Sequence, residues 1–193
     1  MRLEELERRL GDRVSLEWRS FLLRPMPEER SMEDFTAYTD SWGRPSGMAP
    51  EAGFVHPWSG ENPPPNGSLS SGIAGKVAES FGPEAWEAFH KGLLAAYFTE
   101  HRTISDVAVQ ADVAEAAGID RAEFERRLVD DYDAAKAAVI SEYEQAQQAG
   151  ITGIPSVVVD GRYLVSGAVD VEHYIRVVEH VEAERAGEAT APE

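Results

Sequence analysis

The sequence contains no cysteine among its 193 residues. A disulfide framework, a zinc site with thiolate ligands and a cysteine nucleophile are therefore excluded for these residues. Whatever chemistry the residues support must rest on other side chains or on the backbone.

Basic residues are also scarce, with 18 Lys and Arg against 35 Asp and Glu, which gives a formal net charge of −17. This balance argues against a nucleic acid or an anionic membrane as the partner. No apolar run is long enough for a transmembrane helix, and the charged first residues contain no apolar segment of a secretory signal. We therefore expect a cytoplasmic protein with an acidic, solvated surface.

Hydrophobic residues make up 42% of the sequence, which is typical of a globular protein. The first segment has the spacing of an amphipathic helix that ends at Gly11, with its apolar positions at Leu3, Leu6 and Leu10. Residues 14–21 then alternate between apolar and polar, as a half-buried strand does. Residues 25–71 are rich in proline and predict a long loop, with a short helix over residues 32–42.

Residues 72–150 have the pattern of a block of helices. Gly82-Pro83 opens one helix, since proline suits the first helical position. Ser105 or Asp106 caps the next helix, which ends at Gly118. Asp120 with Glu123 resembles a capping box, and the last helix of the block ends near Gly150.

The last residues change in character. Residues 156–159 are β-branched, Asp160-Gly161 is a hairpin turn signal, and residues 163–165 predict the returning strand. A helix follows, with Val171, Tyr174, Ile175, Val178 and Val181 on one face. The element order is thus helix, strand, helical block, β-hairpin and helix, which places the chain in the α/β class.

The bond between Ile154 and Pro155 precedes the first strand of this hairpin. Proline lowers the cost of a cis bond to about 0.5–1 kcal/mol, so a cis bend is feasible here. Such a bend exposes the backbone of Ile154, where an extended peptide can pair as an added strand. The alternative is that Pro155 only begins a strand, as prolines often do.

The residues around this bond carry a family resemblance. Residues 150–161 read GITGIPSVVVDG and residues 164–168 read LVSGA, which resembles the signature of the DsbA-like family, particularly its FrnE-like branch. Residues 21–25, which read FLLRP, also look like that branch. The resemblance implies a thioredoxin-like fold with a helical insertion, and a cis-proline loop that holds the substrate. On this basis we expect the substrate-binding residues to be Thr152, Gly153, Ile154 and Pro155.

The resemblance also implies parts that this sequence lacks. Members of the family carry a Cys-x-x-Cys or Cys-x-x-Ser motif between a first strand and the first helix, where the helix N-terminus lowers the pKa of the thiol. Here the central first strand and its motif are missing. We interpret Met1 as an internal methionine of a longer protein with a misassigned start. The alternative is a genuine variant that dimerises or fills the gap differently.

The resemblance divides the chain into four parts. Residues 1–71 form the helix–strand half of the thioredoxin core with a long loop, and residues 72–150 form the helical insertion. Residues 151–185 form the C-terminal hairpin and helix, and residues 186–193 form an acidic tail.

Three functions are consistent with the sequence. The first is a DsbA-family thiol–disulfide oxidoreductase in its full-length form, acting on protein or small thiol and disulfide substrates. The second is a kappa-like glutathione transferase or 2-hydroxychromene-2-carboxylate isomerase, for which glutathione is the one candidate cofactor. The third is a redox-inactive thioredoxin-fold binding module. No residue of this chain is assigned a catalytic role, and a homodimer is consistent with all three.

The histidines and Trp58 are expected to have structural roles. The histidines show no spacing typical of metal ligands, so we predict no metal site; they are His56, His90, His101, His173 and His180. Trp58 in the long loop is expected to pack within the loop, although a place in the substrate groove is the alternative.

Overall fold

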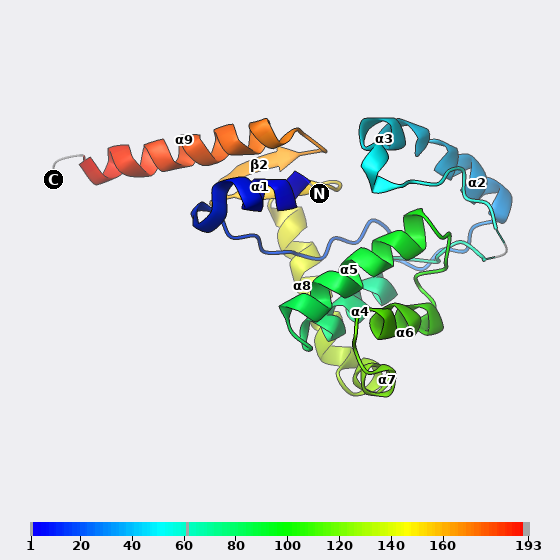
Figure 1. Ribbon diagram of the computed structural model, residues 1–193. Coiled ribbons are helices and arrows are strands. Elements are labelled where there is room, and N and C mark those ends of the chain that lie inside the picture. The colour runs from blue at the N-terminus through cyan, green and yellow to red at the C-terminus, as the bar shows by residue number, and fades with distance from the viewer. Residues whose placement is uncertain (1, 61, 191–193) are drawn as a thin grey trace. The chain divides into compact units, whose positions relative to one another are not determined.

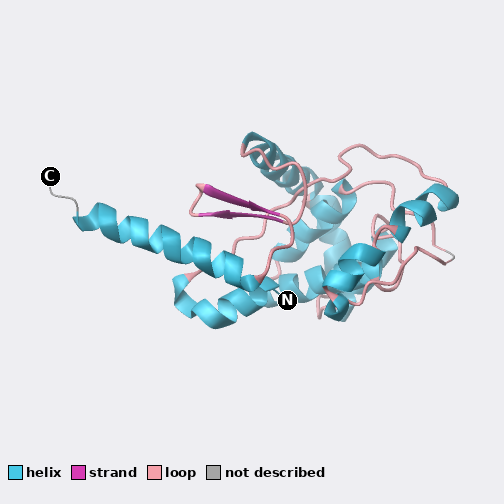
Figure 2. Ribbon diagram, turned by 90° about the horizontal axis from the view of Figure 1, so that it is seen from above, coloured by secondary structure: helices cyan, strands magenta, loops and turns pink. Residues whose placement is uncertain are grey.

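The computed structural model describes residues 2–60 and 62–190, and the chain divides into two compact units. We call residues 1–19 with 145–193 the sheet unit, and residues 20–144 the helical unit. Helices make up most of the chain, and the strands form a single hairpin (Figure 2). Among the described residues, no helix combines the length and the apolar character needed to cross a membrane.

The sheet unit packs two helices against the hairpin. Helix α1 (Arg2–Leu10) leads into a 3₁₀ turn (Gly11–Arg13), and α9 (Val171–Thr190) follows the strands β1 (Ser156–Val159) and β2 (Tyr163–Ser166). Figure 1 shows α1, β2 and α9 side by side. Their shared core consists of Leu6, Leu10, Val165, Tyr174 and Val178. Burial of these apolar side chains stabilises the unit.

The hairpin has the register and the turn that its sequence predicts. Val157 pairs with Val165, and Val159 with Tyr163, in an antiparallel ladder. Asp160 and Gly161 have φ angles of 58° and 66°, the left-handed conformation that a type I′ turn requires at both positions. Because side chains alternate along a strand, Val158 and Leu164 lie on the other face, where they are 42% and 41% exposed.

The strand predicted over residues 14–21 is wrong. Val14 is extended, and burial alternates from Val14 to Glu17, but the sheet contains only β1 and β2, and residues 14–21 pair with neither. A strand needs a neighbour for its backbone hydrogen bonds, and side-chain alternation does not supply one. Helix α9 continues through Thr190, so residues 186–190 of the predicted acidic tail are helical; residues 191–193 lie outside the described residues.

The helical unit contains the remaining helices, together with a 3₁₀ turn at Pro50–Ala52. The helices are α2 (Met32–Asp40), α3 (Gly43–Met48), α4 (Leu69–Glu79), α5 (Pro83–Phe98), α6 (Val107–Ala116), α7 (Arg121–Asp130) and α8 (Tyr132–Gln148), the last of which ends in the sheet unit. Its main core lies among α4 to α8 and includes Ile73, Val77, Phe89, Ala111, Phe124 and Val139.

The helix boundaries follow the capping residues. The side chain of Asp106 accepts a hydrogen bond from the amide of Ala108, and that of Asp120 accepts one from the amide of Glu123, so both predicted N-caps are confirmed. The single helix predicted over residues 32–42 is instead two helices, because α2 ends at Asp40 and α3 begins at Gly43. The four-part division predicted from the resemblance stays a prediction.

Trp58 lies in an aromatic cluster under the long loop. It is fully buried, packs edge-on against Phe35 and stacks on His101, with 4.7 Å between the ring centroids and an interplanar angle of 18°. The indole N–H donates to the carbonyl of Asn62. The predicted packing role of Trp58 is therefore confirmed.

Candidate functional site

The predicted substrate loop, Thr152–Pro155, joins α8 to β1 within the sheet unit. After α8, the amide of Ile151 donates to the carbonyl of Ala146 across 2.9 Å, and Gly150 takes a φ of 77°. This left-handed glycine ends the helix, since such a conformation suits a residue without a side chain. The loop therefore leaves the helix at a defined point.

The other end of the loop is fixed to the hairpin. The hydroxyl of Ser156 donates to the carbonyl of Gly153 across 2.8 Å, and the amide of Gly167 donates to the carbonyl of Pro155 across 2.9 Å. The peptide bond between Ile154 and Pro155 is cis. The four residues are thus held between two anchored ends.

The middle of the loop is open. Ile154 is 53% exposed, and Thr152 and Pro155 are also exposed. Within residues 2–60 and 62–190, the backbone groups of Thr152 and Ile154 form no hydrogen bond with the chain. Unpaired backbone groups beside a strand can accept an extended partner. The loop can therefore bind a backbone, and its one polar side chain is the hydroxyl of Thr152.

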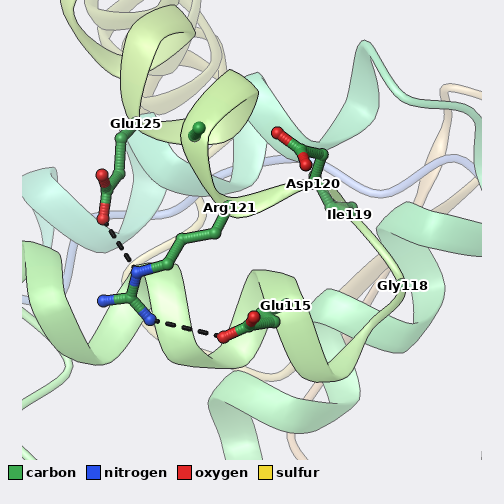
Figure 3. A pocket seen from close by; sticks show the side chains of 7 residues that line it. Glu115, Gly118, Ile119, Asp120, Arg121 and Glu125 are labelled. Carbon is green, nitrogen blue, oxygen red and sulfur yellow. Dashed lines mark hydrogen bonds and ion pairs between the residues drawn. The ribbon is translucent and has the colours of Figure 1, made fainter.

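Ionisable groups also gather in one hollow of the helical unit. In the shallow hollow between α6 and α7, Arg121 forms ion pairs with Glu115 and Glu125 at 3.6 and 3.1 Å (Figure 3). It also binds Asp112, and hydrogen bonds from Arg121 and Arg102 lower the pKa of that carboxyl group. Arg121 is thus paired with three carboxylates beside a hollow of about 580 Å³.

Buried polar groups elsewhere are also structural. Burial raises the pKa of Tyr97 to about 12, so its hydroxyl remains protonated at physiological pH. His101 is 4% exposed and bonded to the backbone through both ring nitrogens. The described residues contain no group of three histidine, aspartate or glutamate side chains placed to hold a metal ion.

Sequence reasoning missed a second hollow, a groove in the helical unit with a volume of about 300 Å³. Its lining includes Gln110 from α6 and Ser70 from α4. One signal was present in the sequence: Gln110 is a polar residue on a helix face that it shares with buried Ala111 and Ala114. Burial patterns alone do not distinguish a polar residue that binds a ligand from one that only supports the fold.

Solved structures show the same overall fold at low sequence identity. A candidate DsbA oxidoreductase from Streptomyces coelicolor is 22% identical, with a TM-score of 0.70 over 100% of this chain and 84% of that chain. A candidate protein disulfide isomerase from Nitrosomonas europaea is 15% identical, with a TM-score of 0.70 over 95% and 88%. The cytosolic disulfide reductase DsbM from Pseudomonas aeruginosa is 14% identical, with a TM-score of 0.58 over 97% and 89%.

The sequence itself matches the family of the DSBA-like thioredoxin domain over residues 66–178. This range covers more than half of the chain and includes most of the helical unit, the substrate loop and the hairpin. The chain therefore belongs to the DSBA-like thioredoxin domain family, and its fold is the thioredoxin-like fold with a helical insertion.

Proposed function

We propose that this chain serves thiol–disulfide exchange by binding an extended substrate polypeptide at the loop Thr152–Pro155. The observation that supports this proposal most directly is the exposure of Ile154. The backbone of Ile154 forms no hydrogen bond with the described residues, whereas both ends of its loop are held by hydrogen bonds. Membership of the DSBA-like family supports the same placement. The substrate would pair its backbone with residues 152–154 and extend toward the first residue of β1.

The attacking thiolate of this reaction belongs to a cysteine outside the 193 residues, because none of these residues is a cysteine. A thiolate attacks one sulfur of the substrate disulfide, a mixed disulfide forms, and the second sulfur leaves as a thiolate. In this proposal the loop positions the substrate, and the cysteine outside these residues carries out the exchange.

Peptide binding by the chain tests the proposal. A short fluorescein-labelled peptide with a central S-methylated cysteine should raise its fluorescence anisotropy on binding. The Ile154→Asp variant should weaken binding about tenfold or more, because the new charge lies where the peptide backbone must pair. Val129→Asp is the matched control, since Val129 is 76% exposed on α7, outside the loop.

Changing the peptide tests backbone pairing without changing the protein. Methylation of a paired peptide amide removes one hydrogen bond and should weaken binding about fivefold. Binding that is equal for Ile154→Asp, Val129→Asp and the unaltered chain would count against the loop. If glutathione alone displaces the peptide from the loop, the glutathione transferase function becomes the better interpretation.

A further inference from the structure

The groove of the helical unit has the size and the lining of a small-molecule site. Its volume, about 300 Å³, lies at the lower end of the range for such sites. Apolar side chains line much of it: Pro25, Leu69, Ile73, Val107, Leu128 and Tyr132. They come from the loop before α2 and from α4, α6, α7 and α8, all within the helical unit (Figure 1).

The buried amide of Gln110 has a fixed orientation. Its Nε2 lies 2.9 Å from the carbonyl oxygen of Ile104 and 2.8 Å from the hydroxyl oxygen of Ser70. A carbonyl can only accept a hydrogen bond, so the nitrogen must be the atom that faces Ile104. The Ser70 hydroxyl donates to the carbonyl of Ser105, and it therefore accepts from Gln110. Both donor hydrogens of the amide are thus used.

The oxygen of the same amide is left without a partner. Gln110 is only 1% exposed, and its Oε1 forms no hydrogen bond with the residues that the structure describes. Every fully enclosed polar side-chain atom of those residues does have a partner, so Oε1 must retain access to solvent. Since Gln110 lines the groove, that access lies there. The groove therefore offers the free acceptor of Gln110 beside its apolar side chains, and its lining also includes Arg24, Asn66 and Ser105.

We propose that this groove binds a small, mostly apolar molecule that donates one hydrogen bond to Oε1 of Gln110. The apolar walls favour an aromatic or alicyclic body. The buried acceptor of Gln110 selects for an N–H or O–H group, because a ligand without one leaves Oε1 unsatisfied when it displaces water. Indole has this chemistry, with an aromatic body and a single N–H. The site lies outside the loop Thr152–Pro155 and does not depend on the function proposed for it.

Two probes of the same shape test the site. Indole carries an N–H, whereas benzofuran has an oxygen at the same position and offers no donor. Titration of the ¹⁵N-labelled chain with indole should shift amide signals of residues 66–70, 105–110 and 128–132. Benzofuran should bind at least about fivefold more weakly than indole, since its oxygen faces the oxygen of Gln110.

Variants that leave Gln110 intact complete the test, because Gln110 also holds Ser70 and Ile104 in place. Val107 lines the groove and is 52% exposed, so Val107→Phe can fill the groove without disturbing the core. This variant should weaken indole binding about fivefold or more, whereas Val129→Phe, on the exposed face of α7, should leave it unchanged. Shifts at other residues, equal affinity for both probes, or unchanged binding in Val107→Phe would each overturn the proposal.

Discussion

At the scale of single residues, His101 shows how a polar side chain is used to build the fold. Its Nε2 lies 2.9 Å from the carbonyl oxygen of Val55. Its Nδ1 lies 2.9 Å from the carbonyl oxygen of Ser59 and 3.1 Å from the amide nitrogen of the same residue. The histidine thus ties two points of the long loop to the aromatic cluster.

Replacing His101 with phenylalanine should destabilise the protein. The His101→Phe variant keeps a ring against Trp58 but leaves backbone groups of Val55 and Ser59 without their partner. We expect a loss of about 1–3 kcal/mol in the free energy of unfolding, measured by urea titration with circular dichroism. His180→Phe is the control, because His180 lies exposed on α9. Equal stability of the two variants would contradict this role.

Single residues were predicted unevenly from the sequence. The packing of Trp58 was predicted, because a tryptophan in a proline-rich loop usually packs against other apolar side chains. The acceptor of Gln110 was missed, since its meaning depends on Ile104 and Ser70, and only the fold brings these residues together. The loop Thr152–Pro155 was chosen by resemblance and stays a prediction, although its exposure and unpaired backbone are consistent with that role.

At the scale of elements, two helical glycines differ in how closely a neighbouring helix packs against them. A Cβ atom added at Gly92 on α5 would lie 2.9 Å from Cγ1 of Val113 on α6, whereas one added at Gly75 on α4 would meet no atom within 4 Å. The close approach of α5 to α6 therefore depends on Gly92. Gly75 lies inside a helix without such a constraint.

Two alanine variants should consequently change stability in opposite directions. Gly75→Ala should raise the free energy of unfolding by about 0.5–1 kcal/mol, because alanine is the better helix former. Gly92→Ala should lower it by about 1–3 kcal/mol, since the overlap with Val113 forces the two helices apart. Thermal unfolding monitored at the helical circular dichroism band separates these outcomes. A stabilising Gly92→Ala would show that the helices do not approach as described.

Elements with local signals were predicted best. Caps at Asp106 and Asp120 and the turn at Asp160-Gly161 are set by neighbouring residues, so the sequence is sufficient to place them. The strand over residues 14–21 failed because ladder hydrogen bonds come from a second segment, which alternation cannot reveal. The break between α2 and α3 was missed because the apolar pattern continues through Trp42.

At the scale of the whole molecule, stability depends on acid through carboxylates whose pKa is lowered by folding. Glu142 is one of them. Burial opposes its ionisation, but hydrogen bonds from Lys76 across 2.6 Å and from the amide of Ser20 across 2.6 Å outweigh burial and lower its pKa. The pair joins α4, α8 and the segment before α2 within the helical unit.

The Glu142→Gln variant should lose part of the acid dependence of stability. A carboxyl group whose pKa is lowered by folding adds stability above its unfolded pKa of about 4.5, and that stability disappears as the pH falls through the folded value. The unaltered chain should therefore lose more unfolding free energy between about pH 5 and pH 3 than Glu142→Gln does. Glu87→Gln, at an exposed pair with Lys91, is the control. Parallel pH curves for Glu142→Gln and the unaltered chain would contradict this argument.

The fold class was predicted from a short motif because residues 150–168 combine a helix end, a loop and a hairpin in a fixed order. The helical insertion was predicted because residues 72–150 have helical patterns, with cap residues at Asp106 and Asp120. The activity could not be predicted from these residues in the same way, since the reaction of the family depends on a cysteine that these 193 residues do not contain. The homodimer, the cytoplasmic location and the FrnE-like branch stay predictions.

The most direct test of substrate binding at the loop uses the lack of cysteine. A single thiol introduced by Ile154→Cys is the only one in the chain, and Val129→Cys gives an exposed control on α7. Each variant is mixed with a peptide whose cysteine carries a thionitrobenzoate group; the protein thiolate attacks the peptide sulfur, and thionitrobenzoate leaves. The rate of each variant with the peptide is divided by its rate with free Ellman's reagent, which corrects for the reactivity of the thiol. On this scale, Ile154→Cys should form the mixed disulfide at least about tenfold faster than Val129→Cys. The reason is that a peptide bound at the loop has a high local concentration beside the new thiol. Equal relative rates would show that the loop does not bind the peptide.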